Sequence, residues 1–156
     1  MSGKCTVAYT AFKAQAKAIK KNLKSLQDGD ADAIHDTRVA SRRLRAVLTE
    51  FKDVFDPDLE KSLRKKTKTI TRKLGQAREL DVSIELLKSF PEDPAAAQVA
   101  ASLQERRKAE DKNVAKAADI AGSDKFQKRL RTLTDAAKGD SCRIRQARMN
   151  PAKRFE

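Results

Sequence analysis

The chain has 156 residues, of which 39% are hydrophobic, so it is long enough to bury the core of one domain. Aromatic residues amount to only 4% and tryptophan is absent, which disfavours a β-sheet protein and favours helices with a core of Leu, Ile, Val and Ala. Lysine and arginine number 35 against 22 acidic residues. The resulting net charge of +13 attracts polyanions such as nucleic acid, anionic lipid or inorganic phosphate polymers.

The first predicted helix covers residues 6–26, where apolar side chains recur at steps of three and four residues. Its stripe consists of Ala8, Phe12, Ala16, Ile19, Leu23 and Leu26. Gly29 predicts the end of this helix, because glycine readily adopts the left-handed backbone conformation that follows many helices. Asp30 or Asp32 is then expected to cap the next helix.

A second helix is predicted over residues 33–55, with an apolar arc and a basic arc on opposite sides. The apolar arc contains Ala40, Leu44, Val47, Leu48, Phe51 and Phe55. The basic arc contains His35, Arg38, Arg42 and Arg45, with Arg43 to one side. Like charges on neighbouring turns repel, so either an anion binds this face or the arginines form a solvated face relieved by nearby acids. Between His35 and Glu50 the only acids are Asp36 and Glu50, which favours the anion site.

A third helix is predicted to begin at Pro57 after the cap residue Asp56. Its apolar stripe is Leu59, Leu63, Ile70, Leu74 and Ala77. Lys66 and Lys73 lie beside this stripe, and they reach the basic arc of the second helix if the two helices pack antiparallel. The other cations of this segment, Arg64, Lys65, Lys68 and Arg72, are predicted to point further out. Gly75 predicts a bend, and helical character is expected to continue until Pro91.

The remainder of the chain predicts two further helices and a tail. A fourth helix is expected from residue 94 to about residue 121, with an apolar stripe that Arg106, Arg107 and Glu110 interrupt. A fifth carries the stripe Phe126, Leu130, Leu133 and Ala137. We therefore expect an all-α antiparallel bundle of four to five helices over residues 1–138, and a basic, loosely ordered tail over residues 139–156.

The cellular location is predicted from cysteine use and from the lack of long apolar runs. Cys5 and Cys142 belong to no CxxC pattern, which is typical of a reducing compartment and not of a disulfide framework. The sequence opens with no apolar leader and holds no run of membrane-spanning length. The expectation is a soluble cytoplasmic protein with no membrane contact.

Two segments resemble motifs of the CHAD family, the conserved histidine α-helical domain. "HDTRVASRRLRAVLTEF" matches the family pattern His-x-x-Arg-Val-x-x-Arg-Arg-Leu-Arg, and "KLGQARELDV" matches Leu-Gly-x-x-Arg-Asp-x-Asp-Val, with Glu79 in place of the first Asp. The matched positions are His35, Arg38, Val39, Arg42, Arg43, Leu44, Arg45, Leu74, Gly75, Arg78, Asp81 and Val82. The resemblance is strongest over residues 6–90.

The resemblance implies two related helical bundles that flank a basic channel binding inorganic polyphosphate, and an association with polyphosphate granules. The chain has about half the usual length and shows no second basic motif. The corresponding hypothesis is that a second copy supplies the missing half in a homodimer.

The basic arc suits a phosphate chain. Arginine donates two parallel hydrogen bonds to phosphate oxygens, and Arg38, Arg42 and Arg45 succeed one another at about 5 Å per turn. His35 is predicted to donate a hydrogen bond to a phosphate oxygen; otherwise it is a helix-terminus side chain without a role. The predicted polyphosphate-binding set is His35, Arg38, Arg42, Arg43, Arg45, Lys66, Lys73 and Arg78, of which the two lysines are as well explained as solvated side chains.

Asp81 is predicted to be a structural acid. If the helix continues past Gly75, Asp81 projects onto the apolar arc, where an unpaired carboxylate is costly. We expect an arginine from the second helix as its partner, the alternative being a bend that leaves Asp81 exposed.

The residues indicate binding and not catalysis. Phosphoryl transfer needs an acidic metal site, a positioned base or a phosphate-cradling loop, and the clustered groups here are cations. One histidine without a cysteine cluster disfavours a zinc site, and the alternative of a Mg²⁺ ion bound through the phosphate oxygens stays open. No cofactor is expected. The alternatives are a nucleic-acid-binding protein, which is disfavoured because the basic arc lacks Asn, Gln and aromatic residues, and a helical interaction module kept soluble by its charge.

Overall fold

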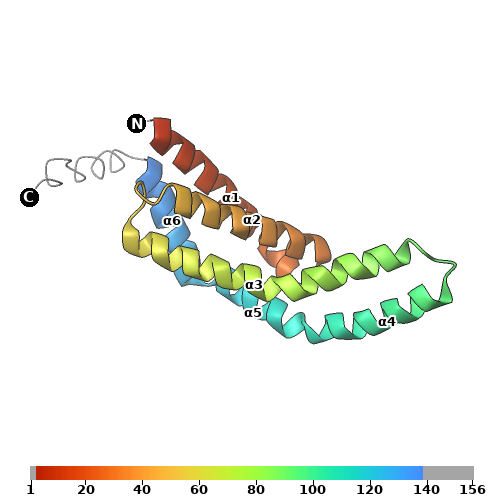
Figure 1. Cartoon of the computed structure of the whole chain (residues 1–156). Helices are drawn as coiled ribbons and strands as arrows, with labels where there is room; N and C mark the ends of the chain where they lie inside the picture. Colours follow the sequence, from red (N-terminus) through yellow and green to blue (C-terminus); the bar gives the residue numbers. More distant parts are fainter. Residues whose placement is uncertain (1–2, 139–156) are drawn as a thin grey trace, which may run out of the picture.

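The computed structural model describes residues 3–138, which form six helices and no strand (Figure 1). The helices are α1 (Gly3–Gln27), α2 (Ala31–Glu50), α3 (Pro57–Lys88), α4 (Pro94–Ala109), α5 (Asp111–Gly122) and α6 (Asp124–Lys138). The prediction of an all-α helical bundle is confirmed. The predicted tail, residues 139–156, lies outside the described residues.

The first three helices run back and forth along one another, as Figure 1 shows. Gly29 lies in the turn between α1 and α2 and has a φ of 75°, which is the expected left-handed conformation. Asp30 caps α2 by accepting a hydrogen bond of 2.9 Å from the backbone N–H of Ala33. The second cap is also as expected: Asp56 accepts from the N–H groups of Asp58 and Leu59 at 3.0 Å each.

Helix α3 is the longest element, with 32 residues, and it continues through Gly75 without a break. Figure 1 shows that it changes direction near its middle and extends past the turn between α1 and α2. Near that turn α3 still borders α2, since Val82 and Ser83 share a hollow with His35, and further out α4 runs beside it. We call this α3–α4 hairpin, residues 79–105, the overhang.

The segment 94–121, which the sequence predicts as one helix, is two helices that meet at Glu110. The physical reason lies in the apolar pattern. Helix α4 buries a single residue, Ala96, whereas α5 buries Val114, Ala117, Ala118 and Ala121 against the bundle. The break at Glu110 lets α5 turn toward α1 and α3, where its small residues pack closely.

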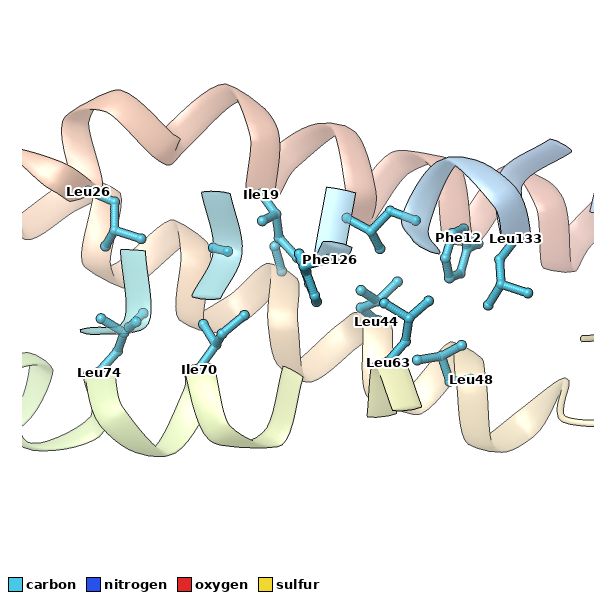
Figure 2. Close-up of a cluster of buried hydrophobic side chains, with 14 of the residues drawn as sticks. Phe12, Ile19, Leu26, Leu44, Leu48, Leu63, Ile70, Leu74, Phe126 and Leu133 are labelled. Carbon is cyan, nitrogen blue, oxygen red and sulfur yellow. The ribbon is translucent and has the colours of Figure 1, made fainter. Parts of the chain in front are cut away.

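The core lies between α1, α2, α3, α5 and α6 (Figure 2). The predicted stripes face one another there, and the rings of Phe12 and Phe55 pack with centroids 5.3 Å apart. Cys5 is also buried in this core and is not a free thiol, so the expectation of unpaired cysteines is wrong for Cys5. Cys142 lies outside the described residues. None of the helices within residues 3–138 combines the length and the apolarity that crossing a bilayer requires.

Candidate anion-binding groove

Helix α2 presents the predicted basic arc to the outside because its opposite side is anchored in the core. Ala40, Leu44 and Leu48 are fully buried. His35, Arg42 and Arg43 are exposed, whereas Arg38 and Arg45 are half-buried. The two half-buried arginines therefore lie closer to the neighbouring helix α3 than the rest of the arc does.

Small residues let α2 and α3 approach each other beside these arginines. Ser41 Oγ and Thr71 Oγ1 share a buried hydrogen bond of 2.7 Å between the two helices. Gly75 faces the guanidinium of Arg38, since a Cβ at this position would lie 3.9 Å from Arg38 Nε. The glycine of the second motif thus lies against an arginine of the first, and the contact fixes how the two motifs meet.

Two hollows lie along the α2–α3 contact, and the first joins the two sequence motifs. This His35 hollow has a volume of about 510 Å³. It is lined by His35, Arg38, Val39, Arg42, Arg78, Glu79, Val82 and Ser83. Residues more than forty positions apart in sequence are therefore combined into one concave, mainly basic surface.

The second hollow continues along α2 toward its C-terminal end. This Arg45 hollow has a volume of about 620 Å³. It is lined by Arg42, Arg45, Ala46, Thr49, Glu50, Arg64 and Lys68. Arg42 lines both hollows, so they form one track, which we call the basic groove.

Four of the five arginines that line the groove keep their hydrogen-bonding capacity for a ligand. Within residues 3–138, no ion pair to a carboxylate is formed by Arg38, Arg42, Arg45 or Arg78. The Nε atoms of Arg38 and Arg45 are buried and have no hydrogen-bond partner. A buried donor without a partner is costly, and these two side chains would have to turn toward an oxyanion in the groove for their Nε atoms to gain an acceptor.

The groove also contains two carboxylates, Glu50 and Glu79. They reduce its positive charge without cancelling it, because each hollow has three or more basic residues in its lining. Arg64 is held in place by Glu60, whose Oε1 lies 2.7 Å from Arg64 Nε. The arrangement is suited to a linear polyanion that follows the two helices.

The structure brings together five of the eight predicted binding residues. His35, Arg38, Arg42, Arg45 and Arg78 line the groove. Arg43, Lys66 and Lys73 line neither hollow. Arg43 is exposed to one side of the arc, as its projection predicts, and the two lysines follow a face of α3 that does not turn toward α2.

Two lining residues, Arg64 and Lys68, were expected to point away from the site. Their spacing from Gly75 could have predicted that they lie on the face of α3 that meets α2. They precede Gly75 by eleven and seven residues, which is three and two helical turns, and Gly75 and Arg78 already mark the face of α3 that meets α2. Lys66 and Lys73 are two positions out of phase with this face.

Asp81 has an arginine partner, but not the predicted one. Arg107 of α4 donates from Nε to Asp81 Oδ1 at 2.8 Å, so the expectation of an arginine from the second helix is wrong. Arg107 also donates from Nη1 to Asp111 at 2.8 Å and from Nη2 to the carbonyl of Gly29 at 3.3 Å. The alternative of an exposed Asp81 is wrong as well, since only 14% of its side chain is accessible. The reason is the length of α3, which carries Asp81 to the level of the turn before α2, where Arg107 of α4 reaches both Asp81 and the carbonyl of Gly29.

Within the described part of the chain, no three histidine, cysteine or acidic side chains are grouped closely enough to hold a metal ion. The groove therefore offers hydrogen-bond donors and positive charge along a track, without a grouped acid–base or metal-ligating set in its lining.

The comparisons with known proteins agree with the motifs that form the groove. The family description "CHAD domain" matches residues 10–155, a range that also includes most of the predicted tail. No curated protein and no solved structure matches the chain. With the family match covering most of its length and the two motifs converging in one groove, the chain belongs to the CHAD family.

Proposed function

We propose that the protein binds inorganic polyphosphate along the basic groove and does not catalyse a reaction on it. CHAD domains are in general associated with polyphosphate binding. The observation that carries the proposal for this chain is that Arg38, Arg42, Arg45 and Arg78 line one groove and, within residues 3–138, form no ion pair to a carboxylate. Phosphate oxygens are the acceptors that fit arginine best.

The composition of the groove supports polyphosphate over nucleic acid. Its lining includes no asparagine, glutamine or aromatic residue, whereas base readout uses the first two and single-strand binding uses aromatic stacking. A bare chain of phosphates needs only cations at regular intervals. We propose a cytoplasmic protein that such binding would bring to polyphosphate granules.

The proposal is tested with two adjacent arginines. Arg42 lines both hollows and Arg43 lines neither, although both are exposed on the same helix and carry the same charge. Arg42→Glu is expected to weaken polyphosphate binding about 100-fold. The substitution removes charge-assisted hydrogen bonds at the centre of the groove and replaces a positive charge there with a negative one. Arg43→Glu changes the net charge equally and is expected to cost less than about tenfold. Equal losses in both variants, measured by calorimetric titration, would show that only overall charge matters.

A competition experiment separates polyphosphate from nucleic acid. Long-chain polyphosphate should displace a labelled DNA duplex from the protein at a similar phosphate concentration, and DNA should displace labelled polyphosphate poorly. The reverse ranking would support the nucleic-acid interpretation. Salt dependence does not decide, because both polyanions release counterions on binding. In the same samples, the absence of released orthophosphate after prolonged incubation is the outcome expected of a protein that binds without hydrolysis.

A further inference from the structure

The overhang carries most of the exposed large apolar residues of the described chain. Of five such residues within residues 3–138, Val82, Leu86, Phe90 and Val99 lie on the overhang, and only Val7 lies elsewhere. A pair of helices without further neighbours cannot enclose a core of its own. The overhang accordingly leaves apolar surface uncovered that the main bundle would bury.

Two of these residues, Val82 and Leu86, lie on one side of α3, and Phe90 follows in the turn after the last residue of the helix, Lys88. Leu80 and Ile84 are buried in the C-terminal part of α3. Val82 and Leu86 are each two positions further along the helix, so they project to the opposite side. Their exposed fractions are 45% and 61%, and Phe90 follows with 56%. We call Val82, Leu86 and Phe90 the apolar stripe.

Charge changes sign along the apolar stripe. At its base lie Arg78 and the other cations of the His35 hollow, and Val82 itself lines that hollow. At its tip lie Glu92 and Asp93, in the turn that leads to α4. The overhang as a whole carries six acidic residues and one lysine, whereas the complete chain has a net charge of +13. Within residues 3–138, the overhang is thus an acidic projection on a strongly basic protein.

We propose that the apolar stripe is the contact between two copies of this chain, which pair antiparallel about a two-fold axis near Leu86. In this arrangement Leu86 meets its own symmetry mate, Val82 of each copy meets Phe90 of the other, and the acidic tip of each copy lies at the basic base of the other. The pattern of basic base, apolar centre and acidic tip is self-complementary only in the antiparallel sense.

The same arrangement limits repulsion between the two basic bodies. Two proteins of charge +13 repel over roughly a Debye length, about 8 Å at physiological salt. Contact through the overhangs places acidic segments between the two basic bodies, with each acidic tip beside the His35 hollow of the other copy. Because the stripe is small compared with the roughly 800 Å² per partner of a stable interface, the dimer is expected to be weak and to depend on concentration.

The proposal is tested by measuring mass against concentration with sedimentation equilibrium. The mass of the full chain should rise from 17.4 kDa toward twice that value as concentration increases. Leu86→Glu should remain monomeric over the same range. Val7→Glu is the matched control, because Val7 is exposed to a similar degree on α1, and it should dimerise as the unmodified chain does. Circular dichroism of each variant confirms that helicity is retained.

The antiparallel register has its own test. Arg78→Glu and Glu92→Arg should each weaken the dimer by about tenfold, and the double variant should recover most of the loss, because the two charges exchange positions across the interface. A chain that stays monomeric at every concentration would overturn the proposal, as would equal effects of Leu86→Glu and Val7→Glu. Dimers that survive Leu86→Glu would assign the contact to another surface. None of these outcomes depends on whether the groove binds polyphosphate.

Discussion

The ion pair between Asp81 and Arg107 yields a sharp prediction about the free energy of unfolding, because Asp81 has a single hydrogen-bond partner whereas Arg107 has three acceptors. Asp81 has one partner, at 2.8 Å, and its second carboxylate oxygen is buried with none. Arg107 has three acceptors, on α3, on α5 and in the turn before α2. Removing the arginine therefore isolates a buried carboxylate, whereas neutralising the carboxylate leaves the arginine with acceptors.

The expected magnitudes follow from burial. Arg107→Met keeps the apolar stem but leaves Asp81, 14% exposed, without any partner, and breaking such a pair costs about 3 kcal/mol of the free energy of unfolding. Asp81→Asn preserves the volume and one acceptor oxygen, so only the charge-assisted part of the hydrogen bond is lost, about 1 kcal/mol. Glu105→Gln, which affects an exposed pair with Lys108 at 3.5 Å, should cost less than about 0.5 kcal/mol.

Urea unfolding followed by circular dichroism measures these differences, provided that the slope of the free energy against urea is the same in all variants. The decisive quantity is the asymmetry between Arg107→Met and Asp81→Asn. If both cost the same, or if Arg107→Met costs no more than Glu105→Gln, the pair is effectively solvated and the reasoning from burial is wrong.

Two further predictions concern the groove. Gly75→Ala should raise the free energy of unfolding by about 0.5–1 kcal/mol, because alanine favours the helix and its Cβ would make an ordinary contact with Arg38 at 3.9 Å. Urea unfolding measures the change, and a loss of stability would show that α2 and α3 cannot accept the methyl group. Polyphosphate affinity should depend on chain length, because His35 and Thr49 are fourteen residues apart on α2 and the groove therefore spans roughly 20 Å, much more than three linked phosphates cover. Equal affinities for tripolyphosphate and a long chain in calorimetric titration would confine binding to one hollow.

Much of the fold is predictable because each helix of the main bundle carries a complete apolar stripe with a cap residue before it or a glycine after it. Asp30, Asp56 and Gly29 act at the ends of helices as their types predict. The split at Glu110 was not predicted, because α4 lacks an apolar stripe and its position is set by contact with α3, which no local pattern records.

The site was predictable on α2 and less so on α3. The opposed arcs of α2 are a property of one helix and follow from its periodicity alone. Which face of α3 meets α2 depends on packing. Lys66 and Lys73 lie beside the apolar stripe, but the face that meets α2 is the one marked by Gly75, and the two lysines are out of phase with it. The partner of Asp81 could not be inferred, because Arg107 is 26 residues away and comes close only where α3 and α4 lie side by side.

The orphaned Nε atoms of Arg38 and Arg45 make folding and ligand occupancy thermodynamically linked. In the ligand-free protein these two unpaired donors lower the stability of the native state, and a bound phosphate chain toward which the two side chains turn would remove part of that penalty. The concentration of phosphate polymer around the protein would then set how firmly its second and third helices hold together, so that the chain is most resistant to unfolding where its ligand is abundant.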